Sequence, residues 1–220
     1  MRLVLIFLLL CVFTRLQAQQ AWINELHYDN QGVDTLEFVE VLLTSVPDTT
    51  GWKLWLYDGV SGLPYDSVAA GEWLPGDSGS AYQLYLWYPK AIQNGPDAIA
   101  IAHYNTLIEF ISYEGSVTAT GGVAMGHTAT DLSASQGSDP AGISMQLTGS
   151  GSAFEHFWWT NTESTAGQLN AGQQFTREPT LLLFGAACAD FGQVPFGASS
   201  QPEAWVVAGA NLSADPDLHL

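Results

Sequence analysis

The chain is 220 residues long, with 47% hydrophobic residues, 12% aromatic residues and a formal net charge of −17. All of its acidic residues lie after residue 18, where the only basic residues are Lys53, Lys90 and Arg177. A phosphate-binding surface needs clustered lysine and arginine, so this composition argues against direct binding to nucleic acid or to anionic membranes. Strong acidity instead suits an exported protein or the capture of divalent cations.

Residues 1–18 predict a secretory signal peptide. An uncharged apolar run from Leu3 to Phe13 follows the basic N-terminus, and Ala18 provides a small residue at the cleavage point. The run is shorter than the roughly 20 residues that span a bilayer, so we expect no membrane span in the mature chain. Cleavage would remove Cys11 and leave Cys188 without a disulfide partner. We therefore expect a secreted protein, extracellular or on the cell surface, that is stabilised by a packed core.

Short alternating or apolar runs, separated by Gly, Pro, Asn and Asp, dominate residues 19–176. Aromatic and β-branched residues are frequent in these runs, and no stretch sustains a period of 3.6, so we expect little helix. This pattern predicts an all-β fold of the sandwich type. The predicted strands are 21–28, 36–43, 52–58, 81–88, 98–104, 107–115, 143–149 and 157–161.

Two later stretches depart from this pattern. Glu114 to Gly142 is poor in large apolar residues and rich in Gly, Ser, Thr and Ala, which predicts a long surface connection containing at most one short strand. Residues 177–180 predict a linker, and 181–220 hold two or three strand-like runs that cannot bury a core of their own. The expected division is a sandwich domain at 19–176 and the truncated start of a second β module at 181–220.

The stretch "WINELHYDNQGVDTLEFVEV", Trp22 to Val41, places several acids inside an alternating frame. Ca²⁺ binds about six to eight oxygens, and four oxygen-bearing side chains surround a turn at Gly32. The spacing differs from that of the EF-hand loop, and in a hairpin Asx side chains also bond their own backbone while Gly supplies positive φ. A calcium site and a structural turn therefore both remain open. The four residues are Asp29, Asn30, Asp34 and Glu37.

Catalysis finds little support in the sequence. Hydrolysis needs a carboxylate pair, a nucleophile with its base, or a metal cage. The histidines are scattered singly, and no H-E-x-x-H, G-x-S-x-G or C-x-x-C motif occurs. Glu25 and Glu37, in two adjoining predicted strands, can instead be polar groups satisfied by backbone donors. We predict that the chain is not an enzyme and has no catalytic residues.

Aromatic residues pose a parallel choice in the predicted strand 52–58. Alternation puts Trp52 and Leu54 on one face and Trp55 and Tyr57 on the other. One face must be core, whereas rings on the other could form a platform that stacks on sugars or contacts a protein. Alternatively, neighbouring loops or domains cover both faces.

Six blocks occur in one order along the chain: "INELHYDN", "DTLEFVEV", "GWKLWLYDG", "IQNGPDAIAI", "IEFISYEG" and "SMQLTGSG". With these blocks, residues 20–175 resemble the bacterial lamin-tail-domain family. The resemblance implies an immunoglobulin-like β-sandwich that serves as a non-catalytic module in secreted or surface proteins, often beside extracellular nuclease or phosphatase domains. The tail, with "DFGQVPFGASSQPEAWVVAGANL", resembles the start of an immunoglobulin-like surface repeat.

These observations predict a secreted, non-catalytic adaptor or interaction module of a larger extracellular or cell-surface protein, with a protein or an extracellular polymer as its partner. One alternative is a carbohydrate- or calcium-binding module, which would expose Trp55 and Tyr57 or gather Asp29, Asp34 and Glu37. The other is an accessory part of an extracellular nuclease or phosphatase whose catalytic domain lies outside this chain. Ca²⁺ is the only cofactor that the sequence suggests.

Overall fold

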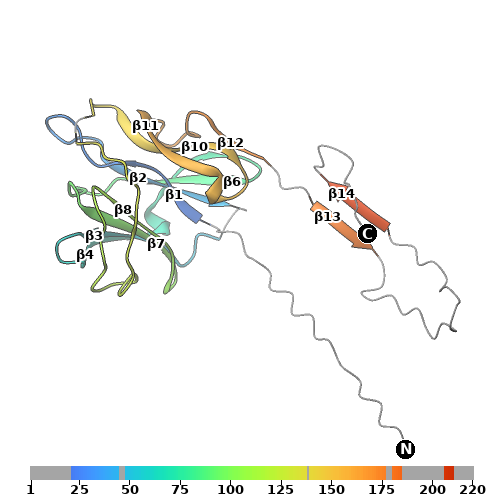
Figure 1. Ribbon diagram of the computed structural model, residues 1–220, viewed down its shortest axis with the longest axis horizontal. Coiled ribbons are helices and arrows are strands. Elements are labelled where there is room, and N and C mark those ends of the chain that lie inside the picture. The colour runs from blue at the N-terminus through green and yellow to red at the C-terminus, as the bar shows by residue number, and fades with distance from the viewer. Residues whose placement is uncertain (1–20, 45–47, 138, 177–179, 185–205, 211–220) are drawn as a thin grey trace, which may run out of the picture.

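The computed structural model describes residues 21–44, 48–137, 139–176, 180–184 and 206–210. Two open sheets form two packed layers, seen one above the other in Figure 1. The described residues include no α-helix, only the 3₁₀ turns Ala70–Glu72 (η1) and Phe154–His156 (η2). The all-β, sandwich-like prediction is therefore confirmed. The predicted signal peptide with its cleavage point at Ala18, and positions 177–179 of the predicted linker, lie outside the described residues.

The first sheet has seven strands in the order β11-β10-β1-β2-β6-β5, with β12 also paired to β10. All pairs in it are antiparallel except β10 with β12. Its strands are β1 (Ala21–His27), β2 (Phe38–Thr44), β5 (Leu74–Ser78), β6 (Tyr82–Trp87), β10 (Ile143–Gly151), β11 (Phe157–Glu163) and β12 (Gln173–Phe175).

The second sheet has five strands in the order β4-β3-β7-β8-β9, and only β8 with β9 is parallel. Strands β13 and β14 form a separate antiparallel pair. Strand β13 begins at Thr180, the last position of the predicted linker. The bounds are β3 (Trp52–Asp58), β4 (Pro64–Ala69), β7 (Asp97–His103), β8 (Thr106–Tyr113), β9 (Thr130–Asp131), β13 (Thr180–Phe184) and β14 (Val206–Ala210).

The main core lies between the two sheets, where apolar side chains from both inner faces pack together. Alternation along each strand sends every second residue into this layer. Aliphatic and aromatic residues fill it, which matches the residue types that sequence periodicity assigned to the strands. Its fully buried members include Ile23, Val39 and Val41 from the first sheet and Leu54, Leu56, Ile99 and Ile101 from the second.

The outer faces of both sheets are partly covered as well. On the second sheet, Tyr57 and Phe110 pack against Val117, Ala119 and Ala124 of the long connection after β8. The stretch from Glu114 to Gly142 is thus more than the surface connection that its composition predicts, because its small side chains lie close against the sheet. On the first sheet, an apolar cluster rich in aromatic residues covers one end of the outer face, and it includes Trp22, Leu42, Phe154, Phe157 and Phe175.

A β-bulge in β1 decides which side chains reach this outer face. Ile23 pairs with Val41 and Glu25 with Glu40, so Asn24 is an extra residue in the ladder. Strict alternation would turn Glu25 to the same side as Ile23, into the core between the sheets. The extra residue instead turns Glu25 outward while Leu26 stays in the core. The outer face therefore receives both members of the pair Glu25 and Glu40.

Candidate functional site

Glu25 is an acceptor for five hydrogen-bond donors. Its carboxylate is fully buried and joins β1 to β10 and to the chain segment that follows β11. This many donors replace the hydrogen bonds to water that a carboxylate loses on burial. The donors are Ser144 Oγ at 2.6 Å, Thr165 Oγ1 at 2.8 Å, Ser164 Oγ at 2.9 Å, Thr165 N at 2.9 Å and Gln146 Nε2 at 3.3 Å.

Glu40, the cross-strand neighbour of Glu25, is also fully buried. It accepts hydrogen bonds from Asn24 Nδ2 at 2.9 Å and from the backbone N–H of Gly167 at 2.8 Å. Its pKa is raised from an ordinary value of 4.5 to about 8, chiefly by burial and also by the charge of Glu25, and these effects outweigh the two donors, which lower it. At neutral pH Glu40 is therefore largely protonated.

Two neighbouring glutamates can in principle act as a general acid and a general base, but here a substrate cannot reach them. Neither side chain exposes surface to solvent, and residues 164–170 cover them. Asn170, itself buried, holds this covering segment through bonds from Nδ2 to the carbonyl oxygens of Asn24 and Leu147, each at 2.9 Å. We infer that Glu25 and Glu40 fasten this segment to the sheet. Glu25 is thus a satisfied polar group, but four of its five donors are side chains, whereas the sequence predicts backbone donors.

The acidic turn between β1 and β2 is far more exposed than this pair. The backbone N–H of Asn30 donates to Asp34 Oδ1 at 3.2 Å, and Asn30 Nδ2 donates to the carbonyl oxygen of Thr35 at 3.2 Å. Partial burial raises the pKa of Asp29, and the neighbouring Asp34 carboxylate raises it further. Asp29 and Asp34 thus lie close enough to repel each other, within a turn that Asx-type hydrogen bonds support.

Glu37 points to a different partner from the other three residues of the predicted calcium site. Its Oε2 accepts the backbone N–H of Ile92 at 2.9 Å, and burial raises its pKa. Among the described residues, no group of three or more His, Cys, Asp or Glu side chains is placed to hold a metal ion. The structure brings Asp29, Asn30 and Asp34 together in one turn, and the calcium site stays a prediction.

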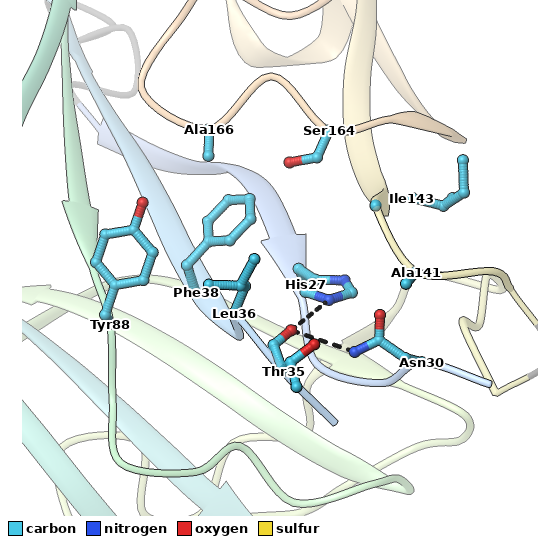
Figure 2. Close-up of a pocket in the computed structure, with 11 residues that line it drawn as sticks. His27, Asn30, Thr35, Leu36, Phe38, Tyr88, Ala141, Ile143, Ser164 and Ala166 are labelled. Atoms are coloured by element: carbon cyan, nitrogen blue, oxygen red, sulfur yellow. Dashed lines mark hydrogen bonds between the residues drawn. The ribbon is translucent and has the colours of Figure 1, made fainter. Parts of the chain in front are cut away.

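A pocket of about 180 Å³ lies beside this turn, on the outer face of the first sheet. We call it the Asn30 pocket. Figure 2 shows His27, Asn30 and Thr35 on one side, with Ser164 and Ala166 of the covering segment opposite. Apolar side chains complete the wall, among them Leu36, Phe38, Tyr88 and Ile143.

Hydrogen bonds fix His27 at the base of the Asn30 pocket. Gln136 donates from Nε2 to the carbonyl oxygen of Ile143 at 2.7 Å and accepts the Tyr28 N–H at its Oε1, so its amide orientation is set. The same Nε2 lies 3.1 Å from His27 Nδ1, which must therefore accept. His27 Nε2, 3.2 Å from the carbonyl oxygen of Thr35, then carries the ring proton and donates it.

Asn30 holds an unused acceptor in the same pocket. Its side chain is only 4% exposed, and its Nδ2 is bonded to Thr35, as the dashed line in Figure 2 marks. Its Oδ1 is buried and has no hydrogen-bond partner among the described residues. In Figure 2 this oxygen points away from Thr35, toward the adjacent Ala141. Buried acceptors are rarely left unpaired, so this atom marks a position where a donor can bind.

The two residues of the predicted stacking platform have different environments. Tyr57 is fully buried, and its hydroxyl accepts the N–H of Ala124 at 3.0 Å. Its ring is thus part of the core on the outer face of the second sheet, which corrects the expectation that it could be exposed. Trp55 is partly exposed, and the Lys53 ammonium lies 4.0 Å from its ring centroid. A flat platform of both rings is not available at this surface.

Sequence reasoning named Asn30 but missed the rest of its pocket. Phe38, Tyr88, Ser164 and Ala166 are far apart in the chain and meet only through strand pairing and the covering segment. One signal was present: Glu25 and Glu40 each interrupt an apolar strand, which indicates a buried polar network on one face of the sheet.

Comparisons with known proteins return no match: no family model, curated protein or solved structure corresponds to this chain. Within the described residues, no helix is both long and apolar enough to cross a membrane. The resemblance to the lamin-tail family therefore remains an expectation from the sequence, and the structure itself establishes an all-β fold with two packed sheets.

Proposed function

We propose that this chain is a non-catalytic interaction module of a larger secreted or cell-surface protein, with a β-sandwich of the immunoglobulin-like, lamin-tail type. The observation that carries the proposal is that the acidic side chain at the centre of the first sheet has a structural role. Glu25 is fully buried and accepts five hydrogen bonds that join β1 to β10 and to the segment after β11.

Binding is supported by what remains available at the surface. The Asn30 pocket has apolar walls and one free buried acceptor, a combination typical of recognition sites. His27, the residue in it best suited to acid–base chemistry, has both ring nitrogens engaged in hydrogen bonds to Thr35 and Gln136. A ligand in this pocket would meet surfaces that position it and no group arranged to attack it.

An activity assay tests the absence of catalysis. Purified 19–220 should not hydrolyse DNA, RNA or phosphate esters in the presence of Mg²⁺ or Ca²⁺. A contaminating hydrolase is recognised by a matched variant, Glu37→Gln, whose side chain is at the surface turn and can change without loss of the core. Turnover that persists through purification and changes with Glu37→Gln would overturn the proposal.

Export is tested separately. The apolar run before Ala18 predicts a mature chain that starts near Gln19. Mass spectrometry of the protein recovered outside the cell should show this start. An intact Met1 in that fraction would contradict cleavage of residues 1–18.

A further inference from the structure

The polar atoms of the Asn30 pocket offer acceptors to a ligand. The Ser164 hydroxyl donates its proton to a hydrogen bond with Glu25, so toward the pocket this oxygen can only accept. The ring N–H of His27 donates to the carbonyl oxygen of Thr35. Asn30 Oδ1 remains as the buried, unpaired acceptor. A matching ligand therefore brings N–H donors; a sugar, whose hydroxyls both donate and accept, is matched less well.

The charge around the Asn30 pocket has one sign. Glu25 lies behind Ser164 on one side, and Asp29, Asp34 and Glu37 belong to the turn on the other side. Neither lysine nor arginine is among the residues that line the pocket. Carboxylates near a partly desolvated site attract a cation and repel an anion. The donor that pairs with Asn30 Oδ1 should therefore carry positive charge.

The walls and the size of the pocket define the rest of this ligand. Phe38 and Tyr88 stand with ring centroids 6.0 Å apart and planes tilted by 52°, beside Leu36 and Ile143. Aromatic faces attract cations and also pack against aliphatic stems. The volume of about 180 Å³ is below the range of roughly 300–1,000 Å³ typical of small-molecule sites, and suits the end of one side chain.

The geometry points to a lysine or arginine side chain of a basic partner polypeptide as the occupant of the Asn30 pocket. Its stem lies along Phe38 and Tyr88, and its cationic end donates to Asn30 Oδ1. The pocket is then the contact point of the interaction module, so this inference rests on the proposed function. A strongly acidic chain and a basic segment are complementary in charge, which also speeds their encounter.

The probe for this inference is a short fluorescein-labelled peptide of alternating glycine and lysine, titrated into the purified protein at moderate salt. A matching arginine peptide gives the second cationic arm, and peptides with norleucine or glutamate in place of lysine give a neutral stem and an anion. We expect binding of both cationic peptides. We also expect the norleucine and glutamate peptides to bind at least about tenfold more weakly.

Variants locate the binding in the pocket. Ala166→Phe fills the space without changing charge and should weaken binding about tenfold or more, while Ala69→Phe, at the exposed last residue of edge strand β4, should leave it unchanged. Asp34→Asn removes a charge beside the pocket, and Asp66→Asn removes the same charge from the second sheet. We expect the larger loss for Asp34→Asn. Tyr88→Ala, at a side chain 46% exposed, repeats the test if Ala166→Phe proves unstable.

Three results would overturn the inference. The first is equal weakening by Asp34→Asn and Asp66→Asn with no effect of Ala166→Phe or Tyr88→Ala, which would show general charge attraction. The second is failure of both cationic peptides to bind the folded protein. The third is tighter binding of the norleucine or glutamate peptide. None of these results contradicts the proposed function as long as the protein shows no hydrolytic activity. Turnover in the hydrolysis assay would contradict the proposed function even if the lysine peptide binds.

Discussion

Two pairs of acids lie within one short stretch of this chain, and the fold treats them in opposite ways. Glu25 and Glu40 are fully buried on paired strands and accept seven hydrogen bonds between them. Asp29 and Asp34 belong to the more exposed turn between the same two strands and lie close enough to raise the pKa of Asp29. The difference shows that the place of a carboxylate in the ladder, more than its residue type, decides whether it fastens the fold or remains available.

The largest effect should come from removing the acceptor of the buried pair. Glu25→Ala leaves the hydroxyls of Ser144 and Ser164 without their acceptor and removes one of the two acceptors of the Thr165 hydroxyl, the other being Asn170 Oδ1, so it should lower the free energy of unfolding by about 3–5 kcal/mol. Asp34→Ala, whose carboxylate accepts one backbone N–H at 3.2 Å, should cost under about 1 kcal/mol. Urea denaturation of both variants makes the comparison. Equal decreases in the free energy of unfolding would show that the buried network stabilises the fold no more than the exposed turn does.

The buried pair also predicts an unusual dependence on pH. The pKa of Glu40 is about 8 in the folded protein against an ordinary 4.5, so between these values the folded chain keeps a proton that the unfolded chain has lost. Stability should therefore be highest near the lower value, fall as pH rises toward 8, and level off above it. Burial raises the pKa of Asp97 from 3.8 to about 6, so its contribution also makes stability fall as pH rises, over a lower pH range.

Urea denaturation from pH 5 to pH 9 checks this prediction. One such group contributes a slope of at most about 1.4 kcal/mol per pH unit. Glu40→Gln should flatten the slope above pH 6, although it also costs stability at every pH because its amide nitrogen cannot accept the Gly167 N–H. An unchanged slope in Glu40→Gln would assign the pH dependence to other acids.

Much of the fold is predictable from sequence because its central strands follow simple rules. The eight strand-like runs correspond to β1, β2, β3, β6, β7, β8, β10 and β11. The missed strands, β4, β5 and β12, each pair with one neighbour only, and β9 is the one short strand that the sequence allowed within Glu114 to Gly142. Pro64 begins β4, and Pro75 with Gly76 interrupts the residues of β5, so neither strand has the residues that favour a buried ladder. Short or polar edge strands carry little periodicity, and neighbours rather than their own residues place them.

The candidate site was harder to predict than the strands. The turn with Asn30 is visible as a run of Asp, Asn and Gly, but the bulge at Asn24 that turns Glu25 outward leaves no periodic signal. Ser164 and Ala166 reach the pocket only because Glu25 and Glu40 hold their segment in place. Long-range hydrogen bonds of this kind depend on the assembled sheet, which explains why the alternatives for the acids could not be separated from sequence.

Amide exchange can sharpen the comparison without any mutation. The N–H groups of Thr165 and Gly167 donate to the buried carboxylates at 2.9 and 2.8 Å, whereas the N–H of Asn30 donates to the exposed Asp34 at 3.2 Å. Opening the covering segment breaks several hydrogen bonds to the two buried glutamates, so we expect Thr165 and Gly167 to exchange about a hundredfold more slowly than Asn30. Hydrogen exchange followed by NMR gives the three rates. Similar rates would mean that the covering segment opens as readily as the turn.

The smallest expected effect concerns calcium at the acidic turn. If Asp29, Asn30, Asp34 and Glu37 held Ca²⁺ in the native state, a hundredfold excess over Kd would add about 2.7 kcal/mol to stability and raise Tm by several degrees. Glu37, however, is committed to the Ile92 N–H, and Asn30 to Thr35, so the turn offers mainly two repelling carboxylates. We expect Ca²⁺ to shift Tm no more than NaCl of matched ionic strength, because both would act by screening. Melting curves with Ca²⁺, with EGTA and with matched NaCl, repeated for Asp34→Asn, test this expectation. A rise seen only with Ca²⁺ and lost in Asp34→Asn would show that the turn forms a cation site that includes Asp34.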